Sequence, residues 1–197
     1  MLLLHRSLPL KTWLRVASSL LSNNVELRCD PPSLASLKAS PEILSLPNFP
    51  THVKSSNENK DYDVEFLDAI IAVQTVASLS DAVNFINSHS SHHTDSIVTE
   101  SSQNAEIYCK AVDSAGVYVN ASTRFADGFR YGFGTEVGIS TGRIHARGPV
   151  GLEGLVIYKY VLVSKGGRGH MAGEFGLGPG KRRFKHASLP LDKGPEF

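Results

Sequence analysis

The residues with the greatest capacity for chemistry lie in one stretch, residues 120–154, which reads NASTRFADGFRYGFGTEVGISTGRIHARGPVGLEG. It contains four arginines among glycines and small hydroxyl residues: Arg124, Arg130, Arg143 and Arg147. Guanidinium groups, together with backbone N–H groups in turns, bind carboxylates and phosphates through paired hydrogen bonds. The stretch is therefore either an anion-binding site or a polar, structured loop, and composition alone favours neither.

The two cysteines, Cys29 and Cys109, are the only thiols that could act as nucleophiles. A reactive thiol needs a pKa lowered by a cation or by a helix N-terminus. We predict that Cys109 lies on the apolar face of a helix, where cysteine is usually buried and inert. Cys29 follows Arg28, but Asp30 offsets that charge. We expect neither to be a nucleophile, and two cysteines without a disulfide framework favour a reducing compartment.

Three other patterns give only weak evidence for a nucleotide-binding or metal-binding site. Gly132, Gly134 and Gly138 resemble a dinucleotide-binding fingerprint, but that motif needs a strand before it and a helix after it, and the flanking residues fit neither. The tail sequence GPGKRR lacks the spacing of a phosphate-binding loop. The histidines at 89, 92 and 93 have no cysteine or spaced histidine partners for zinc. We predict no metal site.

Hydrophobic periodicity indicates the elements that must position these residues. We predict strands at residues 2–5, 25–29, 69–73, 96–99 and 116–120, and helices at 10–21, 31–38, 81–87 and 102–112. Residues 40–62 are rich in Pro, Ser and Asn and are expected to form a long surface connection. Strands that alternate with helices predict an α/β fold with a parallel sheet and helices on both faces.

The first 25 residues allow two interpretations. Four basic residues and no acid before Glu26 match a mitochondrial transit peptide. The alternative is a short strand and a helix whose Leu10, Leu14, Ala17 and Leu21 face the core. The second interpretation is favoured, because another strand follows after a two-residue turn.

The C-terminal part begins with the apolar run LVIYKYVLV, residues 155–163, which we predict to be a strand. Such a strand must pair with its own chain or with another subunit, because a free apolar edge promotes aggregation. We divide the chain into an α/β part (1–152), an apolar strand segment (153–164) and a glycine-rich basic tail (165–197). The net charge of +1 and the lack of a 20-residue apolar run give no case for nucleic acid or membrane as a partner.

Several segments resemble the γ-glutamyl phosphate reductases of the aldehyde dehydrogenase superfamily. VYVNASTRFADG, GTEVGIST and IHARGPVGLEGL are closely similar to signature regions of that family, and residues 93–95 and 65–68 match its H-[ST]-[DE] and E-Y-L-D patterns. The resemblance covers residues 1–163 and corresponds to the C-terminal portion of the family's chains.

The resemblance implies an oxidoreductase of proline biosynthesis in the cytoplasm, with the mitochondrion as the alternative. It would reduce γ-glutamyl phosphate to glutamate-5-semialdehyde with NADP(H). A thiolate displaces phosphate, and the resulting thioester accepts hydride. Glu65 matches the glutamate that binds the nicotinamide ribose, and Asn120, Ser122, Thr123 and Arg124 match the substrate side.

The resemblance assigns structural roles as well. It implies that residues 1–152 are part of an aldehyde dehydrogenase-like catalytic domain and that residues 153–164 are an oligomerisation strand. Gly132, Gly134 and Gly138 match close-packing positions of a glycine-rich loop, and residues 155–163 match a strand that joins a partner subunit in a homo-oligomer.

The family's catalytic cysteine and Rossmann-like segment precede the matched region, and neither cysteine of this chain aligns with that nucleophile. We therefore expect the 197 residues to be a fragment that is inactive alone. The alternative is a non-catalytic remnant that associates with intact reductase subunits.

Overall fold

The structure is a computed structural model that describes residues 1–164 and 169–185. The chain divides into two compact units, Met1–Val156 and Ile157–Phe197, and each is described by itself. Within the described residues, no helix is both long and apolar enough to cross a membrane.

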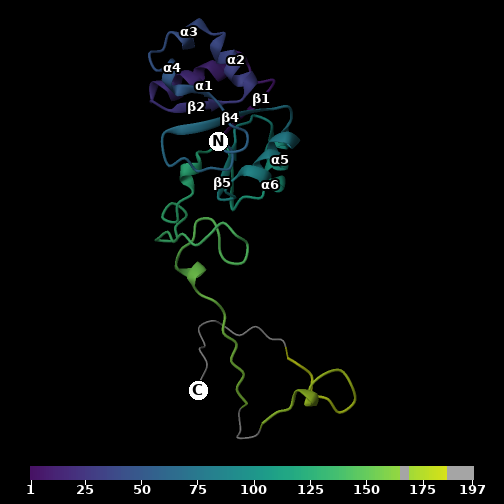
Figure 1. Cartoon of the computed structure of the whole chain (residues 1–197). Coiled ribbons are helices and arrows are strands. Elements are labelled where there is room, and N and C mark those ends of the chain that lie inside the picture. The colour runs from purple at the N-terminus through teal and green to yellow at the C-terminus, as the bar shows by residue number, and fades with distance from the viewer. Residues whose placement is uncertain (165–168, 186–197) are drawn as a thin grey trace. The chain divides into compact units, whose positions relative to one another are not determined.

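The first unit contains a four-stranded sheet in which every pair of neighbours is parallel (Figure 1). Its strands, in spatial order, are β1 (Leu2–His5), β4 (Ile70–Val76), β2 (Glu26–Cys29) and β3 (Val53–Ser55). The helices α1 (Leu10–Ser22) and α2 (Pro31–Lys38) follow β1 and β2 in the chain. Parallel strands require such crossover helices, so the predicted α/β fold is confirmed.

The core of this sheet is formed mainly by α1, β2 and β4. Leu21, Leu27 and Val73 are fully buried there.

The predicted stripe on α1 is right for Ala17 and Leu21 and wrong at its start, where Leu10 is 54% exposed. Trp13 is buried instead, and its indole N–H donates to Ser36 Oγ (2.9 Å). The observed buried stripe of Trp13, Ala17 and Leu21 has helical spacing, as the predicted stripe has. Trp13 is favoured over Leu10 because its indole buries more apolar surface than a leucine side chain.

Residues 40–62, predicted as a long surface connection, lie mostly at the surface but are more regular than expected. They contain the single-turn helices α3 (Pro41–Leu44) and α4 (Phe49–His52), and then β3, which pairs with β2. Prolines in the first turn start both helices, and Ser40 caps α3 through the N–H of Ile43. Ile43 is fully buried, so this proline-rich segment completes the core.

A second, two-stranded parallel sheet lies in the same unit. It consists of β5 (Thr94–Ile97) and β6 (Gly116–Val119), accompanied by α5 (Leu79–His89) and α6 (Ser102–Ala111) (Figure 1). The N-cap of α5 is Ser78, whose Oγ accepts the backbone N–H of Asp81 (3.1 Å), so the helix begins before residue 81, where it was predicted to start.

Cys109 was expected on the buried face of α6, but it is exposed. Tyr108 and Val112 are buried instead, against Val83 and Ile86 of α5. Cys109 lies three residues before Val112 and Tyr108 lies four before it, and both spacings place a residue on nearly the same helix face as Val112. The larger aromatic side chain, Tyr108, occupies the buried position.

Beyond β6 the rest of the first unit is irregular, with two short 3-10 turns, η1 (Thr123–Phe125) and η2 (Leu152–Leu155). The strand predicted at 155–163 is not formed within this chain, because residues 156–164 lie in no helix or strand. Apolar side chains of this segment are almost fully exposed: Ile157 95%, Tyr158 91%, Tyr160 91% and Leu162 101%. A strand needs a hydrogen-bonded neighbouring strand, and among the described residues no strand pairs with this segment.

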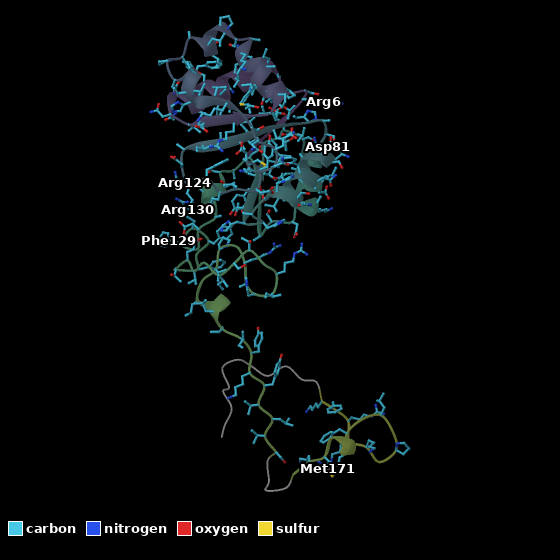
Figure 2. All side chains as sticks on the ribbon, viewed as in Figure 1. Arg6, Asp81, Arg124, Phe129, Arg130 and Met171 are labelled. Carbon is cyan, nitrogen blue, oxygen red and sulfur yellow. The ribbon has the colours of Figure 1, made fainter. Side chains whose placement is uncertain are left out.

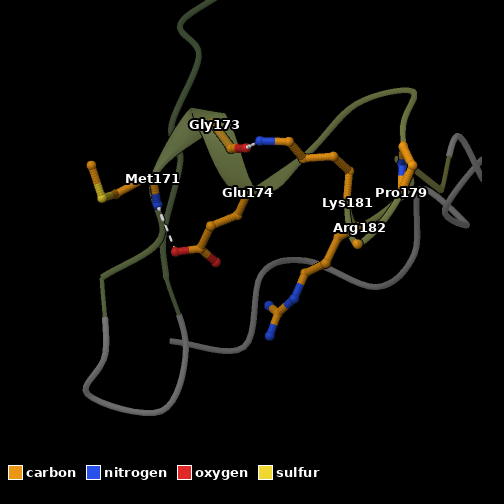
Figure 3. Close-up of a pocket in the computed structure, with 7 residues that line it drawn as sticks. Met171, Gly173, Glu174, Pro179, Lys181 and Arg182 are labelled. Carbon is orange, nitrogen blue, oxygen red and sulfur yellow. Dashed lines mark hydrogen bonds between the residues drawn. The ribbon is translucent and has the colours of Figure 1, made fainter.

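Residues 169–185 of the second unit form one small irregular element. A 3-10 turn, η3 (Ala172–Glu174), is closed by a bridge between Phe175 and Arg182. The Lys181 ammonium donates to the carbonyl of Gly173 beside an open hollow (Figure 3). The predicted irregular tail holds for these residues, while residues 165–168 and 186–197 of that prediction lie outside the described residues.

Candidate functional site

The predicted substrate residues lie at the carboxyl ends of β5 and β6. Asn120 follows β6 directly and adopts a left-handed backbone conformation with φ 53°, which reverses the chain. Its side-chain amide accepts from the backbone N–H of Thr99 (2.9 Å) and donates to the carbonyl of Thr99 (2.8 Å). This joins the loops that follow both strands. Carboxyl ends of neighbouring parallel strands are where ligands bind in open α/β sheets.

The next residues form the η1 turn, which holds Arg124. Ser122 caps this turn by accepting the backbone N–H of Arg124 on Oγ (3.2 Å). Figure 2 shows Arg124 and Arg130 near each other on this part of the chain. Arg130 donates to the carbonyl of Arg124 and lies over the ring of Phe125, 5.9 Å from its centroid. Asn120 and Ser122 thus have structural partners. Within residues 1–164 and 169–185, the Arg124 guanidinium has no hydrogen bond or ion pair.

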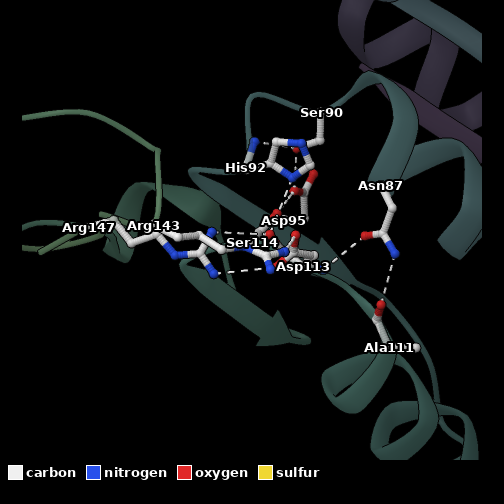
Figure 4. Close-up of polar contacts among 9 residues, drawn as sticks. All are labelled: Asn87, Ser90, His92, Asp95, Ala111, Asp113, Ser114, Arg143 and Arg147. Carbon is white, nitrogen blue, oxygen red and sulfur yellow. Dashed lines mark hydrogen bonds and ion pairs between the residues drawn. The ribbon is translucent and has the colours of Figure 1, made fainter. Parts of the chain in front are cut away.

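The other two arginines of the stretch are bound elsewhere. Arg143 and Arg147 both form ion pairs with the carboxylate of Asp113, in the connection between α6 and β6 (Figure 4). Sequence reasoning did not identify Asp113. A signal was present, because an acid just after a helix faces the negative end of the helix dipole and needs a cationic partner.

Glu65 lies in a separate part of the first unit. It is exposed and lines a hollow of about 450 Å³ with Met1, Phe66, Leu67, Asp68 and other residues of this segment. The segment is anchored by the ion pair between Arg28 and Asp61 (2.7 Å) and by the hydroxyl of Tyr62, which donates to Gln74 (2.7 Å). No hydrogen bond or ion pair among the described residues joins Glu65 to the Asn120–Arg124 loop.

Cys29 lies at the end of β2 and is fully buried. Burial raises the pKa of its thiol to about 11, and the nearby Asp30 carboxylate acts in the same direction. The thiol therefore stays protonated near neutral pH, which opposes a nucleophilic role.

The glycines of the loop do not have the packing role expected of them. Cβ atoms built on Gly132, Gly134 and Gly138 would meet nothing within 4 Å. Gly132 and Gly134 instead have positive φ angles of 84° and 74°, which other residues rarely adopt. Close approach occurs at Gly151, where a Cβ would lie 2.6 Å from Cβ of Phe133.

The three histidines near the end of α5 have separate partners. Nδ1 of His89 pairs with Asp63 (2.8 Å), Nδ1 of His92 contacts the carbonyl of Asp113 (3.2 Å), and Nδ1 of His93 contacts Thr94 Oγ1 (2.8 Å). Among the residues that the structure describes, no three His, Cys, Asp or Glu side chains are grouped as metal ligands.

Parallel strands and crossover helices define an α/β protein, a fold class in which ligands bind at the carboxyl ends of the strands. No family model matches the chain. It is 50% identical over 178 residues to the "Probable gamma-glutamyl phosphate reductase" of Schizosaccharomyces pombe, covering 90% of this chain and 37% of that protein. It is 41% identical over 193 residues to the gamma-glutamyl phosphate reductase of Methanosarcina barkeri, covering 96% of this chain and 40% of the relative.

A solved structure shows the same relationship. The crystal structure of gamma-glutamyl phosphate reductase from Thermotoga maritima matches with a TM-score of 0.70 and 37% identity, over 85% of this chain and 37% of that one. The predicted resemblance is confirmed: in sequence and in fold, the chain is similar to part of these gamma-glutamyl phosphate reductases. It spans 37% to 40% of the length of the relatives just named.

Proposed function

We propose that this chain supplies the substrate-side loop and the coenzyme ribose contact of an NADP(H)-dependent γ-glutamyl phosphate reductase in proline biosynthesis. The observation that carries the proposal is the state of the four arginines in residues 120–154. Arg130, Arg143 and Arg147 have internal partners, while Arg124 presents its guanidinium from a braced turn at the carboxyl ends of two strands. Such a group suits the carboxylate or the phosphate of the substrate.

The residues around Arg124 have supporting roles in this proposal. The Asn120 amide holds the loop to Thr99, and Ser122 and Arg130 fix the backbone of the turn. The Thr123 hydroxyl, which has no hydrogen bond among the described residues, adds a neutral donor beside the guanidinium. The loop thereby binds an anion with little loss of conformational entropy.

Glu65 suits a ribose, because two carboxylate oxygens can accept hydrogen bonds from a vicinal diol. Its exposure beside the 450 Å³ hollow fits that role. The coenzyme, when bound, supplies the hydride of the reduction. In the described residues no glycine-rich loop leads from a strand into a helix to hold its phosphates, so the chain would hold only the ribose.

We infer that these 197 residues do not complete the reaction alone. The acyl group of γ-glutamyl phosphate must pass to a thiolate before hydride can reduce it, and Cys29 is buried with a raised pKa. Cys109 is exposed on α6, but among the described residues no hydrogen bond joins its thiol to a base or to the Asn120–Arg124 loop. The test is phosphate-dependent reduction of NADP⁺ by glutamate-5-semialdehyde with the purified chain. Any turnover would refute the inference, and turnover that survives replacement of both cysteines by serine would also refute the thioester route.

The anion site is tested by titrating inorganic phosphate into the chain. Arg124→Ala should weaken binding at least tenfold, because the guanidinium supplies a charge-assisted pair of hydrogen bonds. Arg15→Ala removes an equal charge from the exposed face of α1 and should leave the affinity within twofold. Equal dissociation constants for the two variants would refute the role of Arg124.

A second candidate function is a non-catalytic subunit that associates with intact reductase. The exposed apolar side chains of residues 157–162 support it, because they are covered by nothing described in this chain. For the reductase itself we propose a homo-oligomer built on this segment, formed in the cytoplasm. The unbonded state of both cysteines suits that reducing compartment.

A further inference from the structure

Asp113 lies just past the C-terminal end of α6, a position that disfavours a negative charge. Its backbone is held on both sides. The N–H donates to Asn87 Oδ1 (2.9 Å), and Nδ2 of Asn87 donates to the carbonyl of Ala111 at the helix end (2.9 Å). The position of Asp113 is therefore set by α5 and α6 together.

Each oxygen of the Asp113 carboxylate contacts a different arginine (Figure 4). Oδ2 accepts from the guanidinium of Arg143, and Oδ1 accepts from Nη2 of Arg147 at 3.4 Å. Nη1 of Arg147 also donates to the carbonyl of Asp113 (3.3 Å). One residue thus neutralises part of two positive charges and holds both ends of the segment 143–147.

A steric contact supports the same arrangement. Gly148 has φ 84°, and a Cβ placed on it would lie 3.3 Å from Cβ of Ala115. The backbone after Arg147 therefore passes close to the connection that holds Asp113. Further along, the carbonyl of Val150 accepts the N–H of Val137 (2.9 Å), and Val150 is buried. The segment is attached by polar contacts at its start and by packing at its end.

The exposure of these groups limits what the ion pairs do. The side chain of Arg143 is 69% exposed, against 24% for Arg147 and 34% for Asp113. Exposed ion pairs contribute little to global stability. Their effect is local, because they determine where this segment lies and which guanidinium groups an anion can reach.

We infer that Asp113 is a positioning residue that clamps residues 143–148 to the α6–β6 connection and withholds Arg143 and Arg147 from the anion-binding loop. Arg124 is then left as the single available guanidinium. The clamp is independent of any ligand, whereas the selection among arginines rests on the proposed function of Arg124.

Limited digestion of the native chain by trypsin tests the clamp, because trypsin must take the arginine side chain into its own pocket. Asp113→Asn should raise the initial rates of cleavage after Arg143 and Arg147 at least tenfold. Cleavage after Arg124 should stay within twofold, and Asp113→Glu should restore most of the protection. Asp81→Asn, an exposed acid on α5 without a cationic partner in the described chain, is the matched control and should change nothing. Unchanged cleavage in Asp113→Asn would overturn the clamp.

Loss of the fold is recognised in the same digest. Arg28 lies in β2, so global unfolding would raise cleavage after Arg28 as well. If that occurs, Arg147→Lys replaces Asp113→Asn. It keeps a trypsin site but loses the forked pair of contacts, so cleavage after residue 147 should rise at least threefold. Protection equal to that of the original chain would refute the clamp.

Titration of inorganic phosphate tests the selection among arginines. In Asp113→Asn we expect at least threefold tighter phosphate binding, and the added affinity should persist when Arg124 is also replaced by Ala. If phosphate binding never depends on Arg124 while the digest behaves as expected, the proposed function fails and the clamp stands. If the digest is unchanged while Arg124→Ala weakens binding, the clamp fails and the proposed function stands.

Discussion

The carboxylate of Asp30 links two elements that are far apart in the chain. Its Oδ1 accepts the backbone N–H of Ser33 (3.1 Å) and so caps α2, while its Oδ2 accepts the backbone N–H of Thr75 (2.8 Å) at the end of β4. Asp30 is only 3% exposed, so both donors are satisfied away from water. A single side chain thus begins a helix and closes the end of the sheet.

Asp30→Ala should lower the free energy of unfolding by about 2–4 kcal/mol, since it removes a cap and leaves a buried N–H without an acceptor. The matched variant is Ser101→Ala, which removes an exposed cap from α6, where Ser101 Oγ accepts the N–H of Asn104 (3.2 Å). That change should cost about 1 kcal/mol. Urea titration measures both, and equal costs would show that the link to Thr75 has no energetic weight.

The two thiols should differ in reactivity. Cys29 is buried with a pKa of about 11, and Cys109 is exposed. Iodoacetamide at pH 8 should therefore modify Cys29 at least about 100-fold more slowly than Cys109, because only the thiolate reacts. Peptide mass mapping over time measures the two rates. Comparable rates in the folded chain would contradict the burial of Cys29, and in 8 M urea both thiols should react alike.

Glu26 should make stability depend on pH. Burial acts to raise the pKa of its carboxyl, but hydrogen bonds from Lys54 and Arg28 outweigh burial and hold that pKa below its ordinary value. Its contribution is therefore fully present above the ordinary carboxyl pKa and is lost as the pH falls through the lowered folded pKa. Glu26→Gln should destabilise the chain by about 1 kcal/mol at pH 7 and progressively less toward pH 3.

Urea unfolding between pH 7 and pH 3 measures this trend. Glu106→Gln is the control, because Glu106 pairs with Lys110 on the surface of α6 with 65% and 74% of the two side chains exposed. Glu106→Gln should change the free energy of unfolding by no more than about 0.5 kcal/mol at every pH. If the difference in unfolding free energy between Glu26→Gln and the original chain grows as the pH falls, the predicted pH dependence is wrong.

Gly132 and Gly138 allow a clean comparison within the loop. Both have open space at the Cβ position, but only Gly132 has a positive φ, of 84°. Gly132→Ala should make the turn around it open more often, since a left-handed alanine costs about 1 kcal/mol. The N–H of Phe133, which donates to Gly128 (2.9 Å), should then exchange with deuterium roughly fivefold faster. Gly138→Ala should leave that rate unchanged, and equal acceleration by both would reject the conformational role.

The exposed segment 157–162 should mediate self-association. Leu162→Lys places a charge among apolar side chains and should weaken association at least tenfold in sedimentation equilibrium. Leu177→Lys is the control, because Leu177 is 93% exposed but lies outside the segment. If the chain is monomeric at all concentrations tested, or if both variants behave alike, the proposed oligomerisation is wrong.

Most elements could be predicted because their signals are local. Pro31 behind Asp30 starts α2, the apolar runs at Leu2–His5 and Ile70–Val76 form strands, and the alternation of strands and helices leads to a parallel sheet. The errors arose where two local patterns were equally good. Tyr108 and Cys109 both had helical spacing, and residues 40–62 combined proline with buried apolar residues such as Ile43.

The candidate site divides in the same way. The sequence by itself determined the residue types at Asn120, Ser122 and Arg124 and the resemblance they carry, because these are properties of consecutive residues. Only the tertiary structure decided that Arg143 and Arg147 form ion pairs with Asp113, while the guanidinium of Arg124 has no partner among the described residues. The physical reason is that an ion pair depends on distance in space. Here the packing of α5 on α6 and the backbone turn at Gly148 bring together groups separated by 30 and 34 residues.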